Sequence, residues 1–203
     1  MTFDPFDPFD PLETARLHLR CVALGDAAAT SALMTPAVSR WVANWPTPFT
    51  PEMATTRIEA SRRSAFTGDA LPFAIVARAD GELLGWTWIQ RNDAERRRGR
   101  LGSWLGERHH GKGYMKEVTP AVLAAGFRLL DLDVIEAAAL PTNAKSLAVM
   151  QACGMKPVRE AMVFAPARER EEFCHVYEIE RTASPPVTVR RPPFPRIQSF
   201  RSV

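Results

Sequence analysis

The sequence has few cysteines and no long hydrophobic run. Its 203 residues include three cysteines, Cys21, Cys153 and Cys174, which lie far apart and match neither a disulfide framework nor a zinc-ligand spacing. No apolar run approaches the ~18–20 residues that span a bilayer. The first residues show no basic region followed by an apolar core, so we expect no secretory signal. These features predict a protein of the cytoplasm that does not bind a membrane.

Acidic residues are missing from the C-terminal stretch. After Arg181 the chain holds four arginines and no aspartate or glutamate. Because the formal net charge of the whole chain is +3, residues 1–181 sum to −1. A nearly neutral folded part does not indicate a nucleic-acid surface, and we expect no nucleic-acid partner. We interpret residues 182–203, rich in proline and arginine, as a solvated tail, with a peptide-module ligand or a nucleic-acid arm as alternatives.

The N-terminal stretch repeats Phe-Asp-Pro three times over residues 3–11. A proline at every third position removes backbone donors and excludes the interior of a helix or a strand. We therefore predict an extended arm over residues 1–11. It is either unstructured or packs its phenylalanines on a neighbouring molecule. Residues 12–181 are then expected to form one domain.

Within that domain, hydrophobic periodicity, helix caps and an Asp-Gly turn predict alternating strands and helices. The arginine-rich stretch at 92–100 is interpreted as a solvated loop. Strands are expected at 17–22, 71–78, 83–90, 102–105, 133–140, 157–164 and 173–179, and helices at 26–34, 51–66, 114–130 and 143–153.

The chain is organised around residues 102–114, which read as an apolar strand, a short basic turn with glycines, and the start of a helix. Such a turn directs several unpaired backbone N–H groups at one point, with the positive end of the helix dipole behind them. This arrangement predicts a binding site for a phosphate-rich anion.

Two kinds of anion fit the turn. Residues 106–113 match the phosphate loop of nucleotide triphosphatases up to the last position, where Gly113 replaces the serine or threonine that would hold magnesium. The loop would also follow several antiparallel strands, which does not suit that class. The alternative is the spacing Arg108-x-x-Gly111-x-Gly113. It resembles the acyl-CoA pyrophosphate turn of the GNAT superfamily of N-acyltransferases, whose glycines let the backbone approach the pyrophosphate.

The resemblance extends to the ribosomal-protein N-α-acetyltransferase branch of that superfamily. Residues 12–20 resemble its opening T-E/A-R-L-x-L-R, residues 111–118 its G-K-G-Y-A-T-E-A, and residues 143–155 its N-x-x-S-x-x-V-x-x-x-x-G-F. Together the similarity covers about residues 12–181. It implies an α/β (α+β) fold: a single GNAT domain with a mixed, mostly antiparallel sheet flanked by helices. The sheet is expected to splay between the family's fourth and fifth strands, with CoA inserted there.

The resemblance also implies a donor site. Backbone amides from His109 to Met115 would hold the pyrophosphate, Trp104 and Leu105 would line the acyl path, and Asn143 would contact the pantetheine arm. The expected residues for acetyl-CoA are Trp104, Leu105, Arg108, His109, His110, Gly111, Lys112, Gly113, Tyr114, Met115 and Asn143.

The catalytic groups are less clearly marked. The family's widespread tyrosine acid is missing, because no tyrosine lies between Tyr114 and Tyr177. Some members of the branch place a hydroxyl near the thioester sulfur, which suggests Ser146 as the acid. Glu136 could deprotonate the amine, directly or through water, or it could be a solvated strand residue. Asn143 and Ser146 have structural alternatives as well, an N-cap and an ordinary first-turn residue.

Tryptophans are the candidates for the acceptor side. Trp41 and Trp45 fall where the family walls the acceptor site, whereas Trp86 and Trp88 share one face of a strand and suit a core equally well. No metal is expected, since the adjacent histidines of the turn point apart and no carboxylate cluster accompanies them.

We therefore predict acetyl transfer from acetyl-CoA to a primary amine, of a small molecule or a peptide, by direct attack in a ternary complex. The alternative from another class is an acyl-CoA-binding sensor without catalysis. A homodimer formed through edge strands is also compatible with the sequence.

Overall fold

The computed structural model describes residues 7–93 and 97–181, which form one eight-stranded sheet in the order β1-β2-β3-β4-β5-β6-β8-β7. Neighbouring strands are antiparallel except for β5 and β6, which are parallel. The strands are β1 (Leu12–Glu13), β2 (Leu17–Cys21), β3 (Ala70–Ala77), β4 (Leu83–Asp93), β5 (Arg98–Leu105), β6 (Val134–Ala139), β7 (Lys156–Ala165) and β8 (Arg170–Glu180).

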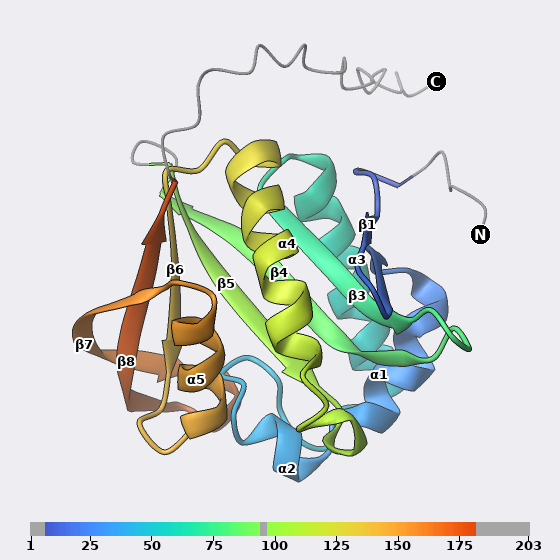
Figure 1. Ribbon diagram of the computed structural model, residues 1–203. Helices are drawn as coiled ribbons and strands as arrows, with labels where there is room; N and C mark the ends of the chain where they lie inside the picture. Colours follow the sequence, from blue (N-terminus) through green and yellow to red (C-terminus); the bar gives the residue numbers. More distant parts are fainter. Residues whose placement is uncertain (1–6, 94–96, 182–203) are drawn as a thin grey trace, which may run out of the picture.

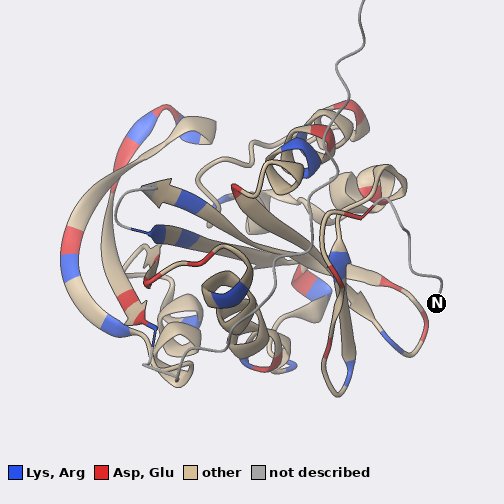
Figure 2. Ribbon diagram, turned by 90° about the horizontal axis from the view of Figure 1, so that it is seen from above, with Lys and Arg blue, Asp and Glu red and all other residues tan. Residues whose placement is uncertain are grey.

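Helices cover both faces of this sheet. In Figure 1, α4 (Tyr114–Leu129) and α5 (Ala144–Ala152) lie in front of the strands, while α1 (Ala27–Leu33) and α3 (Pro51–Phe66) lie behind them. The short α2 (Pro36–Ser39) belongs to the connection between α1 and α3. Viewed from above, the β7–β8 pair curves away from the other strands (Figure 2). Within the described part of the chain, none of the helices is long and apolar enough to cross a membrane.

The alternation of side chains along the strands produces a core on each face. Ala74, Trp86 and Trp104 pack with α1 and α3 on one face, whereas Phe73 and Ile89 pack under α4 on the other. A smaller cluster under α5 joins β6 and β8. Successive side chains of a central strand therefore pack alternately against the helices on one face and those on the other.

The sheet opens between β5 and β6. Their register has only three pairs, Arg98↔Val134, Gly99↔Ile135 and Arg100↔Glu136. Beyond them, residues 101–105 continue to pair with β4, and residues 137–139 with β8. The two strands therefore diverge toward their C-terminal ends, as Figure 1 shows. This confirms the expected mixed, mostly antiparallel sheet with its splay at the family's fourth and fifth strands, which are β5 and β6 because β1 adds a strand at the start.

The loop expected at 92–100 is wrong. β4 continues to Asp93 and β5 begins at Arg98, with residues 94–96 outside the described part. The arginines are tolerated in strands because carboxylates on β6 and β8 pair with them: Arg98 with Glu178, and Arg100 with Glu136. Charge compensation across the sheet was not visible in the local sequence.

The end of the Phe-Asp-Pro arm packs on its own domain. The rings of Phe9 and Phe73 meet edge to face with centroids 4.9 Å apart, and Arg62 Nη1 donates to Asp7 Oδ1 at 2.9 Å. For residues 7–11 this differs from the expected unstructured terminus, while packing of the arm on a neighbour stays a prediction. The remaining part of the arm, residues 1–6, and the tail expected at 182–203 lie outside the described residues.

Candidate active site

The turn between β5 and α4 presents backbone donors at a helix end. Gly111 and Gly113 have φ of +76° and +80°, in the left-handed region that favours glycine. Gly113 is the N-cap of α4, and no side chain caps this helix. The N–H groups of the first turn are thus left for a ligand, and an anion with several acceptor oxygens suits them. These residues fit the pyrophosphate of CoA.

Arg16 braces this turn from the loop before β2. Its Nη1 donates to the carbonyl oxygen of Lys112 at 3.0 Å, and its guanidinium carbon lies 4.6 Å from the centroid of the Tyr114 ring. Its Nε donates to Glu117 at 2.7 Å, and the same carboxylate accepts from the Thr14 hydroxyl at 2.7 Å. Burial alone would raise the pKa of Glu117, but these hydrogen bonds outweigh it and lower the pKa.

This brace gives a physical reason for two of the segments that resemble the family. Residues 12–20 contribute the arginine, and residues 111–118 contribute the turn and the carboxylate. Sequence reasoning recognised both segments and missed their contact. The available signal was an arginine and a glutamate inside two distant motifs.

Three basic side chains of the turn, those of Arg108, His109 and His110, are engaged with the protein itself, whereas Lys112 is exposed. Arg108 pairs with Glu82 of the β3–β4 hairpin, and its Nε donates to His109 Nε2 at 3.0 Å. Burial lowers the pKa of His109 and keeps the ring neutral. His110 Nε2 donates to the carbonyl oxygen of Leu105 at 2.9 Å. In the described residues there is no group of histidines, cysteines and carboxylates arranged to hold a metal ion.

The end of β5 directs one backbone donor at the splay. The Gly106 N–H donates to Leu84 of β4 at 2.9 Å. Since successive residues of a strand direct their backbone groups to opposite sides, the N–H and C=O of Leu105 face away from β4, and His110 binds this carbonyl oxygen. The Leu105 N–H therefore faces the opening beside β6. In addition, the buried indole N–H of Trp104 has no hydrogen-bond partner among the described residues.

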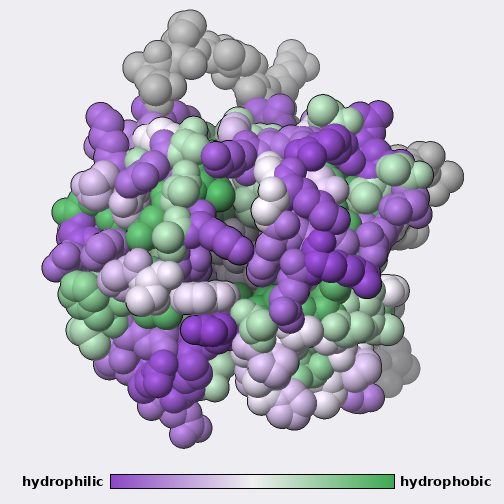
Figure 3. Space-filling model, turned by 60° about the horizontal axis from the view of Figure 1, so that its bottom comes forward, coloured by the Kyte–Doolittle hydropathy of each residue, from purple (hydrophilic) through white to green (hydrophobic). Residues whose placement is uncertain are grey.

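The first turn of α5 carries the other residues expected near CoA. The side-chain oxygen of Asn143 accepts a hydrogen bond from the Ser146 backbone N–H at 3.2 Å, which is an N-cap. Ser146 is half-buried, and its hydroxyl is not needed for the cap. Helices α4 and α5 lie side by side over the diverging strands (Figure 1). Figure 3 looks toward this end of the molecule and shows a recess near its centre.

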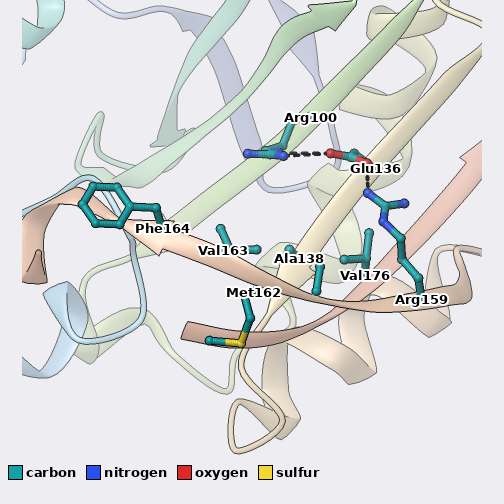
Figure 4. A pocket seen from close by; sticks show the side chains of 9 residues that line it. Arg100, Glu136, Ala138, Arg159, Met162, Val163, Phe164 and Val176 are labelled. Carbon is teal, nitrogen blue, oxygen red and sulfur yellow. Dashed lines mark hydrogen bonds and ion pairs between the residues drawn. The ribbon is translucent and has the colours of Figure 1, made fainter. Parts of the chain in front are cut away.

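Glu136 lies on the opposite face of the sheet, where β5 and β6 separate. Its carboxylate accepts from Arg100 Nη2 at 2.9 Å, Arg159 Nη2 at 2.8 Å and Asn92 Nδ2 at 3.2 Å. Burial raises its pKa, but the hydrogen bonds and charges of the two arginines outweigh this effect, and the pKa is lowered. Figure 4 shows these groups at the edge of a pocket of about 390 Å³, whose other residues, such as Val176, are mostly apolar.

The two tryptophans expected at the acceptor site differ in their surroundings. Trp45 is buried in the core, with its ring centroid 5.2 Å from those of Trp86 and Trp104, and it also lines a second pocket, of about 250 Å³. Trp41 is half-buried beneath the guanidinium of Arg40 and lines neither pocket. Trp45 is thus the one of the two that lines a pocket.

The sequence matches the family described as acetyltransferase (GNAT) domain over residues 16–156. A curated relative, the uncharacterized N-acetyltransferase p20 of Bacillus licheniformis, is 31% identical over 141 residues, which cover 68% of this chain and 78% of the relative. The chain therefore belongs to the GNAT acetyltransferase family, whose members use acetyl-CoA, and is an N-acetyltransferase. This membership favours the enzyme over the non-catalytic sensor.

Solved structures share the fold. A putative ribosomal-protein-serine acetyltransferase from Vibrio cholerae is similar with a TM-score of 0.72 and 24% identity, covering 86% of this chain and 99% of that one. Mycobacterium smegmatis RimJ, solved in complex with CoA-disulfide, has a TM-score of 0.73 and 23% identity, covering 85% and 86%. Proteins of the branch that the sequence resembles are thus among the structural neighbours.

Proposed function

We propose that the protein transfers an acetyl group from acetyl-CoA to a primary amine, of a small molecule or a peptide, by direct attack in a ternary complex. The observation that carries the proposal is the position of the β5–β6 opening. This opening lies between the anion-binding turn before α4 and the face of β4, β5 and β6 on which the two pockets lie. Two reactants can therefore enter from different sides and meet at the end of β5. Such alignment contributes up to about 7–11 kcal/mol in well-oriented cases.

On the donor side, acetyl-CoA supplies the acetyl group as a thioester. The backbone N–H groups between His109 and Met115 bind its pyrophosphate, and the brace from Arg16 holds the turn in position. Asn143 and the end of β5 line the remaining path of the cofactor. The strength of this site depends on backbone geometry more than on side-chain charge, because Arg108 already pairs with Glu82.

The Leu105 N–H is the proposed donor to the oxygen that gains negative charge during transfer. A donor that is already fixed in a strand needs no reorganisation when that charge develops. Removal of one such donor from other acyl-transfer sites costs about 10²–10³-fold in kcat.

Two side chains are proposed to move protons. Ser146 donates a proton to the departing thiolate from the first turn of α5. Glu136 accepts the amine proton through a water molecule, since its oxygens are already held by Arg100 and Arg159. Its lowered pKa keeps it ionised at neutral pH but makes it a weak base, so we expect its contribution to be the smaller one.

Steady-state kinetics test this proposal. We expect thiol release from acetyl-CoA with amines from a panel of amino acids, polyamines, aminoglycosides and short peptides, and intersecting lines when both substrates are varied. Parallel lines, or an acetylated enzyme detected by mass spectrometry, would contradict direct attack. Acetyl-CoA binding without thiol release for any amine would contradict the transfer itself.

The expected homodimer and the cytoplasmic location stay predictions. β7 is an outer strand of the sheet and exposes Met162 and Phe164, so its free edge is the proposed place for pairing with a second copy. Light scattering after size exclusion would show whether a dimer forms, and Phe164→Lys should shift it to the monomer.

A further inference from the structure

The second pocket lies on the face of the sheet that carries α1 and α3, between α3 and strands β4 and β5. Trp45, Trp86 and Trp88 supply aromatic walls, Gln90 a neutral amide, and Arg57 and Arg100 the charged groups. No acidic residue belongs to its lining within the described part of the chain. The pocket therefore combines an apolar surface with positive charge.

Arg57 differs from other arginines that the fold partly buries. Arg20 pairs with Asp26, Arg62 with Asp7, and Arg168 with Glu172. Among residues 7–93 and 97–181, no carboxylate pairs with Arg57. A partly buried cation without a counter-charge destabilises a fold, so the position of Arg57 favours an anion that the described residues do not provide.

The Arg57 side chain is held with its donors available. Its guanidinium carbon lies 4.6 Å from the Trp45 ring centroid, and Nη2 donates to the carbonyl oxygen of Asn44 at 2.6 Å. A guanidinium has five N–H donors in a planar fork, so most of them stay free for a ligand. Burial lowers the pKa of Arg57 from its ordinary value, yet a guanidinium stays protonated at neutral pH.

The pocket is next to the place where acetyl transfer is proposed. Arg100 lines both pockets, and Arg100 and Glu136 are the last pair in the register of β5 and β6 before the two strands diverge. Because Glu136 already compensates Arg100, the uncompensated charge of this region belongs to Arg57. One molecule can thus reach Arg57 with one group and the opening of the sheet with another.

We propose that this pocket binds a carboxylate of the acceptor, so that the substrates are amines that also carry an acidic group. The inference rests on the proposed acetyl transfer and adds the substrate class. Arg57 binds the carboxylate through paired N–H donors, and the tryptophans pack against the carbon chain between carboxylate and amine. The acidic amine is either a free amino acid or a peptide whose first residue is aspartate or glutamate.

Matched acceptors test the proposal. At saturating acetyl-CoA, kcat/KM would be measured for L-glutamate against its diamide, and for Glu-Ala-Ala-amide against Gln-Ala-Ala-amide. Hydrogen bonds to a charged partner correspond to about 10- to 100-fold, so we expect the acidic member of at least one pair to be preferred by that factor. A preference in the first pair indicates a free amino acid, and a preference confined to the second indicates a peptide N-terminus.

Variants on α3 assign the preference to the pocket. Arg57→Gln should abolish it, and Arg57→Lys should retain part of it. Arg63→Gln, which removes the same charge from an exposed position of the same helix, should leave it unchanged. Equal kcat/KM for both members of both pairs, or a preference that survives Arg57→Gln in protein with an unchanged thermal midpoint, overturns the proposal.

A binding measurement separates this inference from the catalytic one. N-acetyl-L-glutamate and acetylated Glu-Ala-Ala-amide, each with its neutral counterpart, would be titrated against the protein with tryptophan fluorescence as the signal. We expect Kd for an acidic ligand to rise at least tenfold in Arg57→Gln. If no amine releases thiol from acetyl-CoA, the proposed function fails, and this titration still decides the subsite. Equal binding of acidic and neutral ligands rejects it.

Discussion

The turn at α4 and the pocket beside α3 are both suited to anions, but they are built in different ways. The turn uses backbone N–H groups at a helix end, positioned by Gly111 and Gly113, while its Arg108 pairs with Glu82. The pocket uses one side chain, Arg57, whose position depends on the packing of α3 against the tryptophans. A backbone site requires particular residues at fixed spacing and leaves a motif. A side-chain site assembled from five separate segments leaves none.

The largest effect is expected from Gly111→Glu. A side chain at φ of +76° strains the turn, and the added carboxylate repels the pyrophosphate, so we expect acetyl-CoA affinity to fall at least about 100-fold. Gly81→Glu is the matched control, because Gly81 also has φ of +76° and lies in a hairpin turn with open space around it. Calorimetric titration with acetyl-CoA would compare the two. Similar acetyl-CoA affinities of the two variants would show that the pyrophosphate does not bind at this turn, and the comparison between the two anion sites would no longer hold.

Ser146→Ala tests whether the Ser146 hydroxyl takes part in the acetyl-transfer step. If the hydroxyl protonates the departing thiolate, kcat should fall about 100-fold. Acetyl-CoA affinity and the thermal midpoint should stay near those of the unmodified protein, since the N-cap uses the backbone N–H of this residue. A variant with full kcat would exclude Ser146 from the mechanism.

Glu136→Gln tests the acceptor side. Loss of the carboxylate removes the partner of Arg100 and one of the two partners of Arg159, which keeps Glu178, and we expect about 1–2 kcal/mol less stability at pH 7, reduced by the partial exposure of both arginines. If Glu136 also accepts the amine proton, kcat should fall by about tenfold or more. The control is Glu160→Gln at an exposed ion pair on β7, for which we expect under about 0.5 kcal/mol.

The pH dependence of the same variant has a definite sign. The folded-state pKa of Glu136 is below the ordinary 4.5, so its ionised form stabilises the fold above that pH. This stabilisation is lost as the pH falls from about 4.5 through the folded-state pKa. Urea unfolding at several pH values should therefore show the difference between the two proteins shrinking below pH 4.5. A constant difference would mean that the ion pairs are not its source.

The smallest effect is expected from Arg16→Ala. Loss of the contacts to Lys112 and Glu117 should loosen the turn and weaken acetyl-CoA binding by about three- to tenfold, because the pair is partly exposed. Arg78→Ala removes an equally exposed arginine that pairs with Glu13 and does not touch the turn, and it should leave the affinity unchanged. Equal affinities for both variants would show that the turn holds its shape without the brace.

Much of the fold was predictable where a periodic pattern and its caps agree. The helix expected at 51–66 has those bounds, since Thr50 caps it and Pro51 occupies its first position. The hairpin around Gly81 and the turn before α4 were also predictable, because each depends on residues that are close together in the sequence. The loop expected at 92–100 was wrong because charged residues in a strand become stable only beside carboxylates that are distant in the sequence. The packing of Phe9 on Phe73 was not predicted either, because these two rings are also distant in the sequence.

The sequence by itself determined the family, the sheet with its splay, and the motif of the donor turn. Glycine spacing reveals the donor turn because the turn depends on residues close together in the chain, whereas the family and the splay were implied by the resemblance of residues 12–20, 111–118 and 143–155 to the family's motifs. Only the tertiary structure decided that Arg16 reaches the turn, that two arginines hold Glu136, and that Arg57 has no carboxylate partner among the described residues. The physical reason is that Coulomb energy depends on distance in space and on burial, and neither is visible until the strands and helices pack together.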